Sequence, residues 1–154
     1  MSEVYSENIE ERDETIEERF RRERIEWRDN VAKMGKKLGK IEDLISLEIE
    51  VYSNRQIALE YSHSIMFTLS RVNAKIRTLK KNKFLFYTNT YDLKLDKDMK
   101  NLFISTDLEK NIVRQELLNN HLTYIKSTID TIDKIIFGLK WRLDIEKYKR
   151  ENIK

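Results

Sequence analysis

The part of the sequence whose residue types best suggest chemistry is residues 71–91, RVNAKIRTLKKNKFLFYTNTY. It contains no acidic residue, although charged residues make up 37% of the chain. A row of cations neutralises several phosphates of a nucleic-acid strand and releases counterions. Aromatic side chains beside it offer faces on which unpaired bases stack regardless of sequence. The residues predicted to bind nucleic acid are Arg71, Lys75, Arg77, Lys80, Lys81, Lys83, Phe86 and Tyr87.

A plainer interpretation of the same stretch stays open. The lysines would then be solvated surface residues, and the first two phenylalanines would close the end of a helical bundle. We favour this core role for Phe84, and a binding role for Lys81, Lys83 and Tyr87.

Catalytic and metal-binding patterns find little support. His63 and His121 have no nearby nucleophile or carboxylate of the triad kind, so both are expected to be surface or packing residues. Asp130 and Asp133 share a helix face without a further ligand, and residues 92–98 lack the glycine and glutamate of a calcium loop. We expect a protein that is not an enzyme and that uses no cofactor and no metal.

The elements that position the basic stretch are expected to be helices. The chain has no Pro and only three Gly, so little interrupts helices. We expect a polar helix over 7–31, a break at Gly35 and Gly39, and a second helix from about 41 to 83. Residues 84–104 are expected to be the least helical, with a short helix near their end. A capping box at 106–109 predicts the start of a third helix running to about 149.

The second and third helices carry apolar residues spaced alternately by four and three, which is typical of a coiled coil or bundle. The fold class is therefore all-α, with two long antiparallel helices. On the third helix, extra apolar residues such as Phe137 and Trp141 widen the surface beyond what one partner helix covers, which favours a homo-oligomer. The alternative is that the first helix covers it. The predicted oligomerisation residues are Leu118, Leu122, Ile125, Ile129, Ile132, Ile136, Leu139 and Leu143.

Charge divides the chain unevenly. Residues 1–30 carry 11 acids and 6 bases, whereas the remainder is basic. We therefore distinguish an acidic N-terminal helical extension, 1–34, from an oligomerising DNA-binding domain, 35–154. One hypothesis is that residues 1–31 fold over residues 71–83 and that DNA displaces them. Another is that the chain is a coiled-coil structural or adaptor protein whose basic residues bind an acidic protein partner.

The sequence also bears on location. The absence of Cys favours a reducing compartment, and the acidic, polar start does not look like a signal peptide. No apolar run approaches the roughly 20 residues that cross a bilayer, so no membrane partner is expected.

The basic and aromatic segment, LKKNKFLFYTNTYD, and the helix after it resemble the UvsY recombination mediator family of T-even-like bacteriophages. The shared pattern is a basic helix ending in aromatics, matched here by Lys81, Lys83, Phe86, Tyr87 and Thr88. A small-Asp start at 105–107 and a long amphipathic helix over 108–149 follow. The resemblance covers roughly residues 41–149. The first 31 residues have no counterpart in it, and the segment after Tyr87 lacks the glycine turn of some members.

The resemblance implies a helical protein that forms a ring-like homo-oligomer in the cytoplasm of an infected bacterial host cell. Such a protein binds single-stranded DNA, helps to displace the single-strand-binding protein, and loads a recombinase without chemistry of its own. The family's basic pair corresponds to Lys81 and Lys83, and its assembly helix to the seam from Leu118 to Leu143.

Overall fold

A computed structural model describes residues 14–153. These residues form four α-helices and one short 3-10 helix, with no strand among them. The helices are α1 (Ile16–Lys37), α2 (Leu44–Asn89), α3 (Lys97–Asp107) and α4 (Glu109–Asn152), and the 3-10 helix η1 (Ile41–Asp43) precedes α2. The all-α prediction is confirmed.

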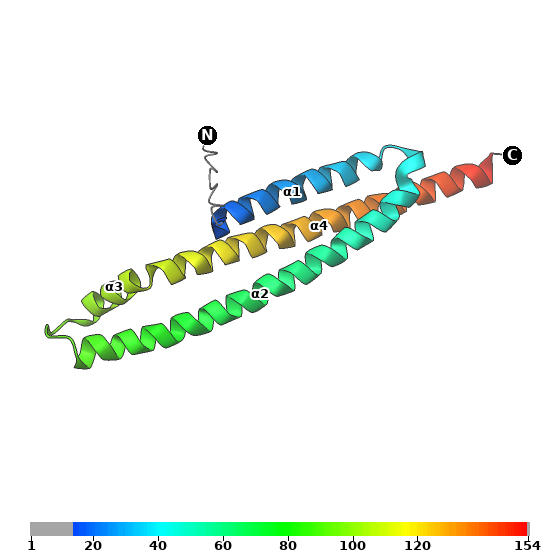
Figure 1. Ribbon diagram of the computed structural model, residues 1–154. Coiled ribbons are helices and arrows are strands. Elements are labelled where there is room, and N and C mark those ends of the chain that lie inside the picture. The colour runs from blue at the N-terminus through cyan, green and yellow to red at the C-terminus, as the bar shows by residue number, and fades with distance from the viewer. Residues whose placement is uncertain (1–13, 154) are drawn as a thin grey trace, which may run out of the picture.

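The two long helices, α2 and α4, run antiparallel as a hairpin (Figure 1). They contain 46 and 44 residues, so each is roughly 65–70 Å long at 1.5 Å per residue. α1 lies beside the half of this hairpin that is nearer the C-terminus, and α3 lies at the opposite end, next to the turn (Figure 1). We call that end the tip.

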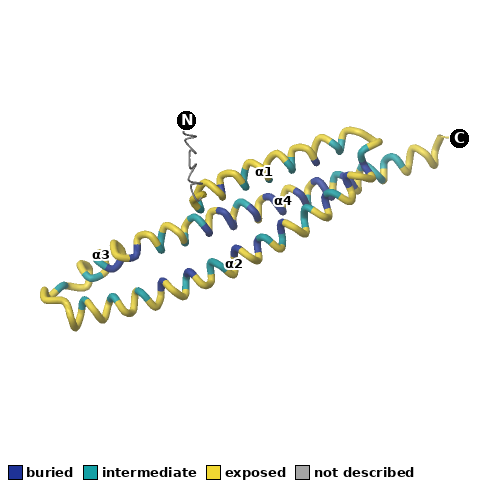
Figure 2. The backbone as a smooth tube through the Cα atoms, in the orientation of Figure 1, coloured by how far each residue is buried: buried dark blue, intermediate teal, exposed yellow. Residues whose placement is uncertain are grey.

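The core consists of two clusters of buried side chains along the hairpin. Figure 2 shows buried residues in dark blue along α2 and α4. One cluster joins Leu47 and Val51 of α2 to Ile132 and Leu139 of α4. The other cluster, closer to the tip, includes Ala58, Ile65, Val72 and Ile76 of α2 with Leu118, Leu122, Ile125 and Ile129 of α4. The apolar spacing predicted from the sequence is therefore the inner face of the hairpin.

The seam predicted to join copies of the chain is occupied inside the subunit. All of its residues from Leu118 to Leu139 are buried, and Leu143 is partly buried. Two residues predicted to widen this surface remain on the outside, since Phe137 is 75% exposed and Trp141 is 64% exposed. A contact between copies that involves α4 would therefore use its outer face unless the subunit opens.

α1 docks on the hairpin through few apolar residues. A capping box begins the helix: the Thr15 hydroxyl accepts from the Glu18 amide, and the Glu18 carboxylate accepts from the Thr15 amide. Phe20 and Met34 are buried, one in each core cluster. α1 thus contributes to the same core as residues 44–139. Its few apolar residues suffice for docking because Phe20 and Met34 are buried in that core. The predicted helix residues 7–13 lie outside the described part of the chain.

The predicted boundaries near the tip are wrong in two places. α2 continues through the aromatic residues to Asn89, so only a short segment after it is non-helical. The capping box expected at 106–109 does not form, because Thr106 lies inside α3 and donates its hydroxyl to the Leu102 carbonyl. Instead, buried Leu108 links α3 to α4, and α3 itself is capped by Asp96, whose carboxylate accepts from the Met99 amide.

Within residues 14–153, none of the helices combines the length and apolar character that crossing a bilayer requires.

Candidate nucleic-acid interface

The predicted cations do not form one continuous row. Successive helix residues are turned by about 100°, and the core-facing side of α2 is marked by buried Val72 and Ile76. Arg71 and Lys75 therefore project on one side of this face, whereas Arg77, Lys80 and Lys81 project on the other. Five of the six are exposed and form no ion pair with a described residue, and the exception is Lys83.

α3 lies on the side of α2 that carries Lys80 and Lys81, and the two helices line an open pocket of about 470 Å³. α2 contributes the two lysines, Phe84 and Leu85. α3 contributes Asn101, Ile104 and Ser105. Ile104 is buried, whereas Phe84 and Leu85 are 45% and 47% exposed. The pocket therefore combines apolar and polar walls with a positive rim.

Lys83 and Tyr87 are both held by Asp107 at the end of α3. The Tyr87 hydroxyl donates to Asp107 Oδ2 at 2.6 Å, and the Lys83 ammonium lies 3.4 Å from the same oxygen. The hydrogen bond to Asp107 raises the pKa of Tyr87 to about 12, and the same bond, with help from Lys83, lowers the pKa of Asp107. Residues 71–91 contain no acid, but in the folded chain they contact Asp107 of α3, whose carboxylate neutralises Lys83.

The aromatic residues after the cations form a cluster at the tip. Tyr87 packs against Phe86, Tyr91 and Phe103, with ring centroids 5.1–5.6 Å apart. Phe86 remains 42% exposed, and the Lys83 ammonium lies 5.8 Å from its ring centroid. Tyr87 is therefore chiefly a packing residue of the tip, while Phe86 keeps a surface for contacts.

On the opposite side of α2, a second basic and aromatic pair lies farther from the tip. The Arg71 guanidinium lies 4.4 Å from the ring centroid of Phe67, which is 61% exposed. A cation over a ring face is attracted by the ring's quadrupole. This pair shows that the chain presents cations with aromatics on both flanks of the hairpin.

The half of the hairpin that ends in the tip carries an excess of positive charge. Residues 61–120 include 11 Lys and Arg against 6 Asp and Glu. Such an excess attracts polyanions over distances of about one Debye length, roughly 8–10 Å at physiological salt.

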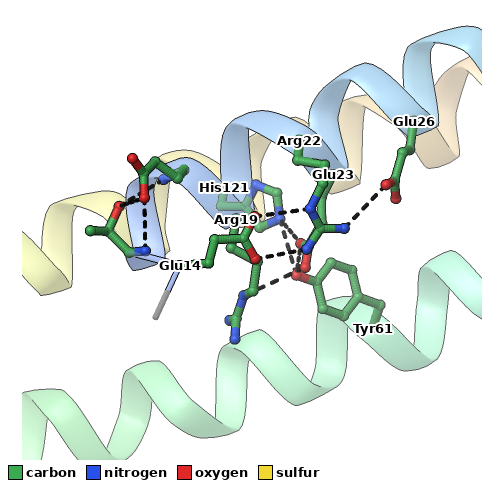
Figure 3. Close-up of polar contacts among 9 residues, drawn as sticks. Glu14, Arg19, Arg22, Glu23, Glu26, Tyr61 and His121 are labelled. Carbon is green, nitrogen blue, oxygen red and sulfur yellow. Dashed lines mark hydrogen bonds and ion pairs between the residues drawn. The ribbon is translucent and has the colours of Figure 1, made fainter. Parts of the chain in front are cut away.

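A second cluster of titratable groups joins α1, α2 and α4 away from the tip (Figure 3). His121 has no exposed surface and stacks on Phe20, with ring centroids 3.9 Å apart. Its Nε2 lies 2.9 Å from Glu23 Oε2 and 3.1 Å from the Tyr61 hydroxyl, which donates to the same Glu23 carboxylate (Figure 3). Burial lowers the pKa of His121 although Glu23 raises it, and burial followed by the Glu23 bond raises the pKa of Tyr61.

This His121 cluster resembles a catalytic group only in composition. The expected packing role fits the complete burial of His121 and its contacts with α1 and α2. No set of three His, Cys, Asp or Glu side chains in residues 14–153 could hold a metal ion.

Sequence reasoning missed the pocket, and the core role expected for Phe84 is wrong. Phe84 was expected in the core but is an exposed residue of the pocket wall. Tyr87, in contrast, is held by a hydrogen bond to Asp107. The spacing of Phe84 from Lys80 and Lys81, four and three residues, places the three side chains together on a helix and was a usable signal. The polar wall from α3 had no signal in the sequence, because it depends on how α3 folds back.

The helix α1 does not cover the basic residues. Its polar contacts with α2 are Lys37 with Glu50, Asn30 with Asn54, and Glu23 with Tyr61, all before residue 71. α1 itself contains five acids and eight bases, so the acidic character belongs to the residues before it.

No protein-family model matches this chain, and neither the curated proteins nor the solved structures include one that is significantly similar to it.

Proposed function

We propose that this protein is a non-enzymatic mediator of recombination that binds single-stranded DNA and helps to load a recombinase onto strands coated by single-strand-binding protein. The observation that carries the DNA-binding part is the set of exposed cations that have no acidic partner among the described residues and lie beside exposed aromatic rings, Phe84 at the tip and Phe67 farther from it. Cations bind the phosphates, and rings accept unpaired bases without reading sequence.

The recombination role rests on the resemblance of residues 41–149 to the UvsY family. Under this proposal the partners are single-stranded DNA, the recombinase, the single-strand-binding protein and further copies of the chain. A ring-like homo-oligomer would place several tips along one strand, which raises avidity without new contacts. Its setting is the cytoplasm of an infected bacterial cell.

The proposal is tested by fluorescence anisotropy of labelled oligo-dT and of a duplex of equal length across a salt series. We expect tighter binding to the single strand, weakening steeply with salt. The Lys80→Ala plus Lys81→Ala variant should bind more weakly, and its salt slope should fall by roughly one unit for each phosphate that the variant no longer binds.

The Arg71→Ala plus Lys75→Ala variant is the matched comparison, since it removes two cations from the other flank of the same helix. Equal decreases in affinity in both variants would mean that the strand contacts both flanks. If the unmodified chain does not bind oligo-dT at low salt, the proposed function is wrong, and the basic residues would instead serve an acidic protein partner.

A further inference from the structure

The pocket between α2 and α3 has a size and a lining that suit a small flat ligand. Its volume of about 470 Å³ lies in the range of roughly 300–1,000 Å³ typical of pockets for small organic molecules. The wall from α2 is apolar and consists of the half-exposed Phe84 and Leu85, and buried Ile104 of α3 adds to this apolar lining. An aromatic side chain and two aliphatic ones provide the contact area that a planar ring needs.

The opposite wall supplies hydrogen-bonding groups. Asn101 and Ser105 are four residues apart on α3, so their side chains are neighbours one turn apart. An amide and a hydroxyl together offer both donors and acceptors. The edge of a nucleobase also mixes donors and acceptors, whereas an apolar protein side chain would leave this wall unpaired.

The rim carries the charge that the rest of a nucleotide requires. Lys80 and Lys81 line the pocket, and neither forms an ion pair with a described residue. Arg77 lies four residues, about 6 Å along the helix axis, before Lys81, so the positive side chains continue from the rim along α2. Phosphates on either side of a base in the pocket would therefore meet cations.

From this arrangement we infer that the pocket takes one unpaired base of the bound strand, with its ring against Phe84 and its edge at Asn101 and Ser105. The inference rests on the proposed function and adds a reason for strand selectivity. A base within a duplex is stacked and paired, and it enters such a pocket only after it is flipped out.

The test compares two probes of equal length, oligo-dT and an oligomer of abasic sites that keeps every phosphate. The Phe84→Leu variant removes the ring while keeping apolar bulk. It should lower oligo-dT affinity about five- to ten-fold, because stacking on one base is worth about that or more. Its affinity for the abasic probe and its salt slope should not change, and Asn101→Ala should act in the same direction.

Two controls separate the pocket from general effects. Phe67→Leu removes an exposed ring from the other flank of α2 and should not reproduce the decrease. Lys80→Ala plus Lys81→Ala should weaken both probes alike, since those residues bind phosphates. Thermal unfolding of each variant checks that the helices remain intact.

The outcomes distinguish the two proposals. If Phe84→Leu weakens neither probe, or both equally, while the lysine variant still weakens binding, the base pocket is wrong and single-strand binding stands. Unchanged DNA binding in Phe84→Leu would indicate that the pocket binds an apolar side chain of a protein partner and not a base. If the unmodified chain binds neither probe, both proposals fail together.

Discussion

At the scale of single residues, His121 shows how one buried polar side chain can fix the position of a whole helix. Its ring accounts for contacts with Phe20 and Glu23 of α1 and with Tyr61 of α2. Because Nε2 faces the Glu23 carboxylate, we place the proton of the neutral ring on Nε2. Nδ1 then has no partner among the described residues, so a second proton would be buried without an acceptor.

This arrangement predicts a pH-dependent stability. The charged groups that face His121 are Glu23 and the more distant Arg19 and Arg24 of α1, and Tyr61 faces it from α2. Burial lowers the pKa of folded His121 below its ordinary value of 6.5. As the pH falls below 6.5, His121 takes up a proton in the unfolded chain but stays neutral in the folded chain. The free energy of unfolding should therefore fall, by at most about 1.4 kcal/mol per pH unit.

Urea unfolding followed by circular dichroism between pH 7.5 and 5.5 measures this decrease. The His121→Phe variant keeps a flat ring against Phe20 but cannot be protonated, so the decrease should disappear. The matched control is His63→Phe, which changes the exposed histidine and should retain it. The same decrease in the His121→Phe variant would exclude His121 as the cause.

The residue scale also shows which details the sequence could predict. Lys80 and Lys81 are exposed and pair with no described acid, as expected for a segment that has no acidic residue from 61 to 91. The pairing of Lys83 with Asp107, 24 positions away in sequence, could not be predicted. It depends on the turn after α2, which brings α3 back against the aromatic residues.

At the scale of elements, α4 uses its faces for different contacts. One face packs on α2. A second face contacts α1, where the Tyr124 hydroxyl donates to the Arg24 carbonyl. The outer face is exposed. On that outer face Phe137, Trp141 and Tyr148 are each more than 60% exposed, and their spacing of four and seven aligns them along the helix. Aligned exposed apolar side chains mark interaction surfaces more often than isolated ones do.

If the chain self-associates as proposed, this outer face is one apolar surface that the subunit leaves exposed for it. The Phe137→Ser plus Trp141→Ser variant should then lower the mass of the oligomer, measured by light scattering over a range of concentrations. Burial of each side chain in such an interface is worth about 1.5–3 kcal/mol, which the serines would not supply.

The control for this variant is Phe67→Ser, which removes a comparably exposed ring from α2 and should leave the mass unchanged. Thermal unfolding should be almost unaffected in both variants, because neither set of side chains belongs to the core. An oligomer of unchanged mass would show that copies meet elsewhere.

The elements were largely predictable because their apolar spacing is regular over α2 and α4. Their ends were not. Thr106 and Glu109 satisfy the capping pattern, yet the chain continues helically through Thr106 and turns at Leu108, whose burial outweighs the cap. The pattern Thr15 to Glu18, in contrast, forms the cap that its sequence allows.

At the scale of the whole molecule, the two halves of the α2–α4 hairpin differ in how many other helices pack against them. Next to α1 the hairpin is a three-helix bundle with buried Met34, Leu47 and Ile132. Beyond the start of α1, α2 and α4 pair with each other, and α3 joins them only near the turn (Figure 1). Local stability follows the amount of buried apolar contact around a segment.

Amide hydrogen exchange should therefore show a gradient along α2. Amides of residues 44–61, beside α1, should exchange more slowly than those of residues 77–89 at the tip. Addition of oligo-dT should slow exchange mainly in the second group. Uniform protection along α2 would contradict the unequal support described here.

The unequal support also has a mechanical consequence. The bending stiffness of parallel rods held together rises with their number, so the half beside α1 is a stiff stem and the two-helix stretch between α1 and α3 is the compliant part (Figure 1). The side chains proposed to hold DNA, including Lys80, Lys81 and Phe84, lie beyond that compliant stretch, where α3 packs on α2. A strand under tension would bend the tip before it disturbed the stem, and several tips on one strand could follow its curvature while their stems kept a fixed spacing.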